Sequence, residues 1–408
     1  MNWQQYSLNN GLRLISIHRP GTRTVACRFF ARAGSRYDGE HPGLAHMLEH
    51  MLFKGTQHYT SQDIFGSIEA HGGEINAHTT REYVSLHTVT LADDLPLALD
   101  MLAEICLLPK FSQEAFLNEK LVVLGELEGS RDQSSVLYDL FLENLWQDSS
   151  LRNPITGTVE GLRDIALEDL RGFYQQRFVA GNSILVICGD VQHNEAQSLA
   201  QSAFNQFPSG PEQKPGPFEE PARNTPSGAH LERATQRTYM LLGVPTVGLS
   251  HPDRSALKII ELVLGMGASG RLYQRLREEL GVVYNVNAVS SVYEHCGYLA
   301  IYAVCAPENL TVVQDAILDE WGDIQKNGIT DEEMNAAKGN YAGTLARRFE
   351  TNLSVAGIFG IEGLLYQVEP FEQAIARING VRREGVREAA QKYLNEDSYV
   401  IASVGKAK

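Results

Sequence analysis

A weak internal repeat is the feature that most restricts the fold of this chain. Two landmarks recur, a His-Pro pair that opens an amphipathic helix and a Gln-(Arg/Lys)-aromatic triplet that precedes a strand. They lie at His41-Pro42 and His251-Pro252, and at Gln176-Arg177-Phe178 and Gln391-Lys392-Tyr393. The spacings are 210 and 215 residues, and two nearly equal spacings predict a tandem duplication. We therefore expect two domains of similar architecture, which suits a chain of 408 residues.

Each half combines predicted hairpins with amphipathic helices. In the first half, Asn9-Asn10-Gly11 lies between two short apolar runs, which is a strong hairpin signal. The patterns predict strands at 6–8, 12–17, 24–32, 183–188 and 398–403, and helices at 44–53, 61–71 (with Ser61 as N-cap), 95–107, 113–130 and 256–264. Because strands and helices do not alternate strictly, the predicted class is α+β: two duplicated domains, each a mostly antiparallel sheet flanked by helices.

The clearest change in composition is a stretch at 208–228 that concentrates Pro, Gly and charge. We interpret this stretch as a linker between the domains. The predicted domains are therefore residues 1–207, which carry the candidate catalytic residues discussed below, and residues 229–408.

Composition disfavours several classes of function. With 35 Lys plus Arg against 50 Asp plus Glu, the formal charge of −15 repels nucleic-acid phosphate and favours a basic peptide partner. No apolar run approaches about 18 residues and the chain opens without a leader pattern, so we expect neither a membrane span nor export. The five cysteines are scattered without a CxxC pair. This fits a cytoplasmic protein and leaves His, Asp or Glu as ligands of any metal.

The most specific motif is His46-Met47-Leu48-Glu49-His50, in the predicted helix 44–53. His46 and His50 are four residues apart and project from one face, so two imidazoles can converge on one ion. Glu49 borders that face, where a carboxylate can take a proton from a reacting water. The order His-x-x-Glu-His is the inverzincin pattern, the reverse of HExxH. The simpler alternative is an amphipathic helix whose histidines are only solvated.

A catalytic zinc usually has three protein ligands and one open position, so a third donor is needed. Glu119 and Glu126 are seven residues apart in the predicted helix 113–130, and therefore face the same way about 10 Å apart along its axis. One of them could be the ligand, while the other could orient a ligand or water. Spacing alone does not say which, and both could simply belong to the solvated face of the helix.

These motifs resemble the pitrilysin/insulinase family of zinc metallopeptidases, and within it the half-length branch similar to the mitochondrial processing peptidase β subunit. The resemblance covers essentially the whole chain. It implies that His46, His50 and Glu126 hold one Zn2+ per chain and that Glu119 supports these ligands from behind.

Two further segments are similar to family motifs. The stretch from Gly72 to Glu82 looks like the edge strand on which a peptide is laid as an extra strand. Asn76 and Ala77 occupy its substrate-holding positions, and His78 is a possible subsite residue rather than a ligand. The stretch from Ser269 to Tyr284 looks like the segment that carries the family's Arg/Tyr pair, here Arg277 and Tyr284. A guanidinium and a phenol can donate hydrogen bonds to the carbonyl oxygens of a substrate.

The resemblance implies a zinc-dependent endopeptidase in which Glu49 takes a proton from water and returns it to the leaving amine. Half-length members assemble two chains into a closed chamber that admits short or unfolded peptides. Here the zinc-site residues share a chain with Arg277 and Tyr284, so we expect a homodimer with two complete sites, each built from both chains.

Two other functions stay open at this point. The residues from Gly265 to Gly270 read G-x-G-x-x-G, the dinucleotide-binding pattern. That pattern needs a preceding strand, whereas residues 256–264 have helical spacing. The other alternative is a non-catalytic structural or partner subunit of the same family. Such subunits typically lose zinc ligands, but every expected ligand is present here.

Overall fold

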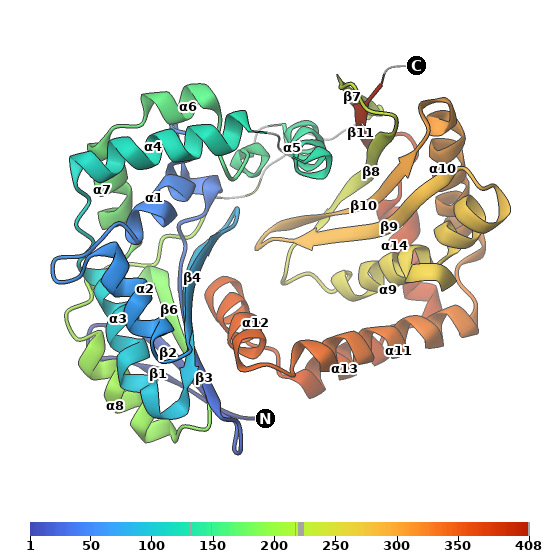
Figure 1. Cartoon of the computed structure of the whole chain (residues 1–408). Coiled ribbons are helices and arrows are strands. Elements are labelled where there is room, and N and C mark those ends of the chain that lie inside the picture. Colours follow the sequence, from blue (N-terminus) through green and yellow to red (C-terminus); the bar gives the residue numbers. More distant parts are fainter. Residues whose placement is uncertain (130–131, 148, 217, 219–223, 407–408) are drawn as a thin grey trace. The chain divides into compact units, whose positions relative to one another are not determined.

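The computed structural model describes residues 1–129, 132–147, 149–216, 218 and 224–406 (Figure 1). The chain forms two compact units, and each unit is discontinuous in sequence. Unit 1 comprises Met1–Ser130, Asn153–Gly216 and Arg348–Pro370, and unit 2 comprises Arg131–Arg152, Pro217–Arg347 and Phe371–Lys408.

Unit 1 contains a six-stranded sheet of order β1-β2-β6-β3-β5-β4. Its strands are β1 (Asn2–Ser7), β2 (Arg13–His18), β3 (Thr24–Ala31), β4 (Glu74–Thr79), β5 (Val84–Leu91) and β6 (Ser183–Gly189). Only β2 and β6 pair in parallel, and the other neighbours are antiparallel. The strand β4, which carries Asn76 and Ala77, therefore forms one edge of the sheet.

Unit 2 contains a five-stranded sheet of order β7-β11-β8-β10-β9. Its strands are β7 (Ser227–Glu232), β8 (Thr238–Val247), β9 (Val283–Val292), β10 (Cys296–Cys305) and β11 (Val400–Gly405). The order repeats β2-β6-β3-β5-β4 of unit 1, and the one parallel pair, β7 with β11, falls in the same place. The predicted α+β class with a duplicated, mostly antiparallel architecture is confirmed.

Some of the helices repeat as well. The helices are α1 (Leu44–Leu52), α2 (Ser61–Glu69), α3 (Leu95–Leu107), α4 (Gln113–Glu128), α5 (Gln133–Leu145), α6 (Val159–Asp164), α7 (Leu167–Arg177), α8 (His193–Ala203), α9 (Arg254–Gly265), α10 (Leu310–Asn327), α11 (Asp331–Arg348), α12 (Asn352–Leu365), α13 (Phe371–Asn379) and α14 (Arg383–Tyr393). Lys120 of α4 donates to the carbonyls of Arg163 and Ile165 near the end of α6. Lys338 of α11 donates in the same way to Asn379 and Val381 near the end of α13. The two lysines therefore align α4 with α11 at a separation of 218 residues.

One helix of each sequence half packs on the sheet that the other half of the sequence forms. In unit 2, α5 covers β8 and β11, and in unit 1, α12 covers the equivalent strands β3 and β6 (Figure 1). Glycines let α12 approach its sheet closely, because a Cβ at Gly360 would overlap the Phe30 ring and a Cβ at Gly363 would lie 2.8 Å from Ile184. Compact units therefore differ from the sequence repeats, whose predicted boundaries at 207 and 229 stay a prediction. The predicted linker includes residues 217 and 219–223, which lie outside the described residues.

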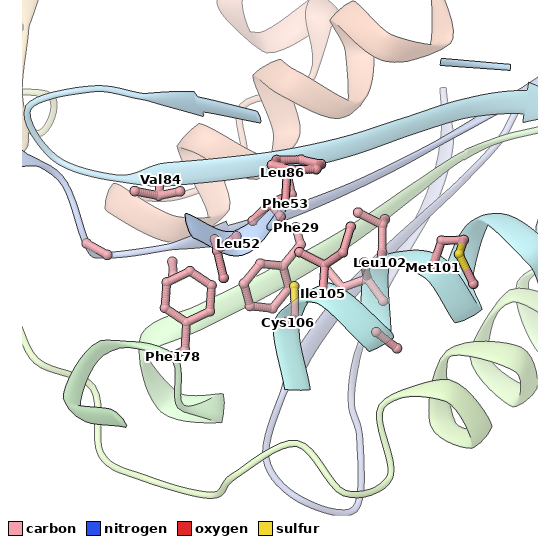
Figure 2. Packing of buried hydrophobic residues seen from close by; sticks show 14 of the residues in the cluster. Phe29, Leu52, Phe53, Val84, Leu86, Met101, Leu102, Ile105, Cys106 and Phe178 are labelled. Atoms are coloured by element: carbon pink, nitrogen blue, oxygen red, sulfur yellow. The ribbon is translucent and has the colours of Figure 1, made fainter. Parts of the chain in front are cut away.

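The main core of unit 1 lies between the sheet and the helices on the face opposite α12. Figure 2 shows part of it, where Phe29 of β3 gathers with Leu52 of α1 and with Ile105 and Cys106 of α3. In unit 2, period-two alternation along β8 divides the side chains, since Met240 and Leu242 face the α9, α10 and α14 side whereas Leu241 faces α5. Burial on both faces explains why these strands are apolar throughout.

Several local predictions are confirmed and some limits are corrected. The hairpin of β1 with β2, the helix α3 and the helix preceding the G-x-G-x-x-G glycines are present as predicted. The N-cap of α2 is Thr60 and not Ser61, because Thr60 forms a capping box with Asp63. The predicted helix 113–130 ends at Glu128, and Ser130 lies outside the described residues. Among the described residues, no helix combines the length and apolar character that a membrane crossing requires.

Candidate metal centre

The helix α1 begins with an unusual turn that a buried carboxylate stabilises. Gly43, at the N-cap position, has a φ of 103°, which favours glycine, and it supplies no side chain to cap the helix. Asp38, which is buried, accepts hydrogen bonds from the amides of Gly43 (2.7 Å) and Ala45 (2.9 Å). Asp38 therefore satisfies the first amides of α1 and stabilises the end of the helix that lies next to His46.

His46, His50 and Glu126 converge on one point. The three residues place one ligand atom each within 4.8 Å of one another. His46 Nε2 and His50 Nε2 lie 3.2 Å apart, and His50 Nε2 lies 3.8 Å from Glu126 Oε2. Two histidine nitrogens on a tetrahedral zinc, with Zn–N bonds of about 2.0–2.1 Å, are about 3.3 Å apart. The donor set therefore fits zinc in both chemistry and spacing.

The two histidines differ in how the protein holds them. His50 Nδ1 donates to Glu119 Oε1 (2.9 Å), which leaves Nε2 as the free lone pair. His46 Nδ1 is buried with no hydrogen-bond partner among the described residues. Burial, and after it the nearby imidazoles of His50 and His78, lower the pKa of His46 to about 4. His46 is therefore neutral near pH 7, the state in which it can bind a metal.

Glu119 lies behind the donor set. Its side chain is only 7% exposed and also contacts Lys54 Nζ, at 2.6 Å. A buried carboxylate is stable as an anion when it is paired and hydrogen-bonded, and Lys54 together with His50 provides both. Glu126 lies in the donor set, whereas Glu119 contacts the other ring nitrogen of His50. Lys54 was not predicted, although it lies four residues after His50.

Glu49 lies outside the donor set and is half-buried. Its Oε2 accepts a hydrogen bond from the hydroxyl of Thr79, a buried residue at the end of β4. Sequence reasoning missed Thr79. The available signal was its place in the predicted edge strand, three residues after Asn76.

The strand β4 is open on one side. It pairs with β5, in the register Asn76 with His87 and Ala77 with Leu86, and no second strand pairs with it in the described chain. The side chain of Asn76 is exposed and its Oδ1 accepts from the amide of Ala77 (2.8 Å). The strand also packs against α1, so the open edge and the donor set are neighbours within unit 1.

A buried ion pair connects the segment before α1 to the turn after β4. Arg36 and Glu82 form a 2.7 Å pair in which both side chains are almost fully buried. The amides of Ser35 and Arg36 donate to the carbonyls of Thr80 and Arg81. These contacts hold α1 and β4 in a common framework. Breaking the ion pair would be costly, because removing one partner of a buried pair leaves an uncompensated charge.

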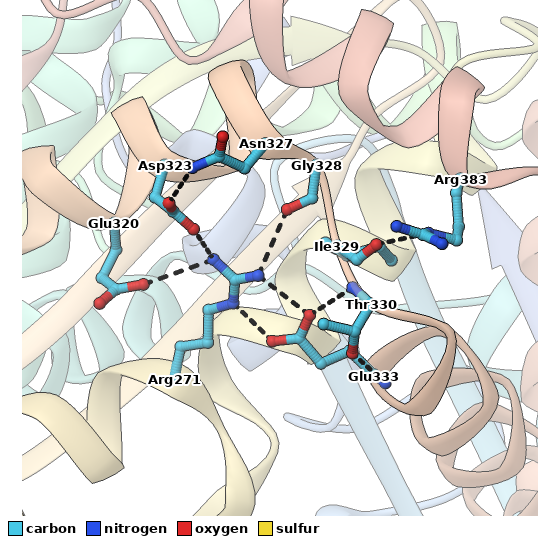
Figure 3. Close-up of polar contacts among 9 residues, drawn as sticks. All are labelled: Arg271, Glu320, Asp323, Asn327, Gly328, Ile329, Thr330, Glu333 and Arg383. Carbon is cyan, nitrogen blue, oxygen red and sulfur yellow. Dashed lines mark hydrogen bonds and ion pairs between the residues drawn. The ribbon is translucent and has the colours of Figure 1, made fainter.

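Arg277 and Tyr284 lie in unit 2. Arg277 is on the π-helical turn η6 (Tyr273–Glu279), and Tyr284 is on β9. Figure 3 shows how Arg271, just before this turn, binds Glu333 (2.6 Å), Asp323 (2.7 Å) and the carbonyl of Gly328. Such π-helical turns are rare and occur frequently at functional sites.

The second repeat has lost the metal-binding chemistry. At the equivalent positions of α9, 210 residues further on, Ala256, Ile259 and Ile260 replace His46, Glu49 and His50. The lysine alignment places Ala337 and Thr344 where the first repeat has Glu119 and Glu126. Within the described residues, the two-histidine and glutamate set occurs once.

Replacing Glu119 tests whether its hydrogen bond to His50 strengthens zinc binding. In the metal-loaded protein, Glu119→Gln should weaken zinc binding about 10–100-fold, since a neutral amide neither orients the His50 ring as firmly nor pairs with Lys54. Competition with a chelator measures the affinity. The control is Glu114→Gln, which changes an exposed glutamate of the same helix and should leave the affinity unchanged. Equal affinities for all three proteins would contradict the supporting role.

The fold and the donor set define a class of protein: a two-repeat α+β protein with one zinc-type site on its first repeat. Family models described as "Insulinase (Peptidase family M16)" and "Peptidase M16 inactive domain" match residues 13–159 and 164–341. The chain belongs to the pitrilysin/insulinase (M16) peptidase family, as a half-length unit. The second of these models spans the α9 positions at which the ligands are replaced.

Relatives of similar length match nearly the whole chain. An uncharacterized zinc protease of Mycobacterium leprae is 31% identical over 395 residues, covering 96% of this chain and 89% of the relative. The uncharacterized zinc protease YmxG of Bacillus subtilis is 28% identical over 404 residues, covering 98% of both chains.

Solved structures confirm the fold. A peptidase M16 inactive domain from Pseudomonas fluorescens superposes with a TM-score of 0.92 at 23% identity, covering 100% of this chain and 99% of the other. A protease from Helicobacter pylori gives a TM-score of 0.92 at 21% identity, with 99% of both chains covered.

Proposed function

We propose that this protein is a zinc-dependent endopeptidase that hydrolyses short or unfolded peptides. The observation that carries the proposal is the donor set of His46, His50 and Glu126, with Glu49 beside it but outside it. This combination provides three ligands, an open metal position and a separate carboxylate, which is what metal-assisted peptide hydrolysis requires.

When bound, zinc would supply Lewis acidity toward water and the substrate carbonyl. The residues of the chain perform the remaining steps. Thr79 binds Oε2 of Glu49 and so leaves Oε1 to accept a proton from the attacking water. Glu49 then passes that proton to the leaving amine as the peptide bond breaks, which regenerates its carboxylate.

The open edge of β4 would hold the substrate. An extended peptide that pairs with this edge satisfies main-chain donors and acceptors and is recognised largely independently of its sequence. The exposed Asn76 and His78 would contact every second side chain of that peptide, because side chains alternate along a strand.

We further propose that two chains form a homodimeric chamber in which Arg277 and Tyr284 of one chain act at the zinc site of its partner. Support comes from the family resemblance and from the presence of both groups on one polypeptide. A two-fold dimer would then contain two complete sites. The alternative, a non-catalytic partner subunit, accounts less well for an intact donor set accompanied by Glu49.

Cleavage of one disulfide-bonded protein, in its reduced and its oxidised form, tests this function. The zinc-loaded enzyme should cut the reduced, unfolded form in several sequence contexts and leave the folded, oxidised form intact, because only an extended chain can pair with β4. Chelation should abolish cleavage and one equivalent of Zn2+ should restore it. An N-methylated amide at a paired position should weaken peptide binding, since it cannot donate a hydrogen bond. Equal cleavage of both forms, or cleavage without metal, would contradict the proposal.

A further inference from the structure

Tyr284 lies in a β-bulge. Along β9, Asn285 pairs with Val304 of β10 and Val283 pairs with the next residue, Cys305, so Tyr284 has no partner on β10. The burial pattern shows the same break in alternation: Tyr284 and Asn285 are both exposed, between the buried Val283 and Val286. A bulge re-aims a side chain, and here it leaves the Tyr284 side chain 54% exposed.

Arg237 stacks on this tyrosine. Its Cζ lies 4.1 Å from the centroid of the Tyr284 ring, a cation–π contact. The backbone of Arg237 is held on both sides, because its carbonyl accepts from the Thr235 hydroxyl and the next residue, Thr238, starts β8 and pairs with Cys305. Arg237 therefore reaches across the end of β10 to the bulge on β9.

Arg277 approaches the same bulge. Its Nη1 donates to the carbonyl of Val283 (2.6 Å), the residue that precedes Tyr284. Two guanidinium groups thus contact adjacent residues of one exposed bulge. Arg277 uses one donor for this contact, and a guanidinium has five.

Neither guanidinium has a carboxylate partner in the part of the chain that the structure describes, whereas several other arginines of unit 2 do. Arg271, Arg275 and Arg383 pair with Asp323, Glu279 and Asp331. Two guanidinium groups without a carboxylate partner therefore meet at one exposed bulge, in a chain whose formal charge is −15. An external anion would neutralise them.

We propose that Arg237 completes, with Tyr284 and Arg277, a subsite that binds a carboxylate of the peptide substrate. This inference rests on the proposed function. The carboxylate is either an Asp or Glu side chain or the C-terminal group. A planar guanidinium can bind it with two parallel hydrogen bonds, and the phenol can donate a third. Stacking on the ring restrains Arg237 before the peptide arrives, which reduces the side-chain entropy lost on binding.

Binding to zinc-loaded Glu49→Gln protein tests the subsite separately from catalysis. Four fluorescent peptides share one sequence, with Asp or Asn at one internal position and a free or amidated C-terminus. We expect a peptide with a carboxylate to bind roughly tenfold more tightly than the uncharged peptide. Adding Arg237→Met should remove this preference and keep the affinity for the uncharged peptide. Arg237→Lys should recover only part of it, because an ammonium lacks the planar fork.

The matched control is Arg275→Met, which removes a partly buried arginine already paired with Glu279 and should leave the preference unchanged. Loss of the preference on amidation identifies the C-terminal group as the ligand, and loss on Asp→Asn identifies the side chain. An unchanged preference in Arg237→Met, an equal loss in Arg275→Met, or no binding of any carboxylate peptide would overturn the subsite. Absence of hydrolysis by the wild-type enzyme with the preference intact would overturn only the proposed function.

Discussion

Zinc-loaded Glu49→Gln protein is expected to retain its metal and to lose about 10²–10⁴ of its hydrolytic rate, the usual contribution of a general base. Glutamine is nearly isosteric with glutamate, and its carbonyl oxygen can still accept the Thr79 hydrogen bond. It cannot accept the proton of the attacking water. Because Glu49 lies outside the donor set, zinc content should stay near one per chain. Metal analysis and kcat on the same sample measure the two effects.

His50→Ala is the companion variant. It removes one ligand and the partner of Glu119, so zinc content should fall together with activity. Near-normal hydrolysis by metal-replete Glu49→Gln protein, with contaminating protease excluded, would refute the role of Glu49. Loss of zinc in Glu49→Gln would instead show that this carboxylate helps to hold the metal.

Mixing two inactive variants is expected to restore activity if the active site is built from two chains. Glu49→Gln protein keeps Arg277 and Tyr284, whereas Arg277→Ala protein keeps zinc and Glu49. In a mixed dimer, one of the two sites would combine the intact parts. With random subunit exchange about half of the dimers are mixed, which gives roughly a quarter of the wild-type sites. Peptide hydrolysis before and after exchange measures the recovery.

The control mixture combines Glu49→Gln with His50→Ala. Both changes lie in the same part of the site, so no mixed dimer contains a complete one and activity should not recover. Verified exchange of Glu49→Gln with Arg277→Ala that gives no more activity than this control would place Arg277 opposite the zinc of its own chain, or show that it takes no part in the reaction.

Local sequence patterns predicted the helices α1, α2, α3, α4 and α9, and the donor geometry that depends on one helix alone. The range of α3 is confirmed residue for residue, and α1 differs by one residue at its end. His46 and His50 converge because four residues complete about one helical turn. The N-cap of α2 was wrong by one residue because two hydroxyl residues, Thr60 and Ser61, stand side by side and only the capping box with Asp63 distinguishes them.

The sequence did not predict contacts between segments that are far apart in the chain. The Thr79 hydroxyl meets Glu49 only because β4 lies beside α1, and Lys54 meets Glu119 only because α4 crosses α1. The Arg237 contact with Tyr284 requires a bulge on β9, and no residue type in that strand predicts a bulge. Each pair has an ordinary surface interpretation in the sequence, since a lone Thr, Lys or Arg is usually solvated.

The sequence by itself determined the duplication, the α+β class, the family and the set of candidate ligands. These properties depend on periodicity and on residue spacing, which act within one element or repeat over the chain. Only the tertiary structure decided that α5 belongs to unit 2 and α12 to unit 1, so that each covers a sheet formed by the other half of the sequence. It also decided which side of His50 each glutamate occupies. These outcomes depend on how helices pack on sheets across more than a hundred residues, and a local pattern specifies which face of a helix is apolar but not which sheet covers it.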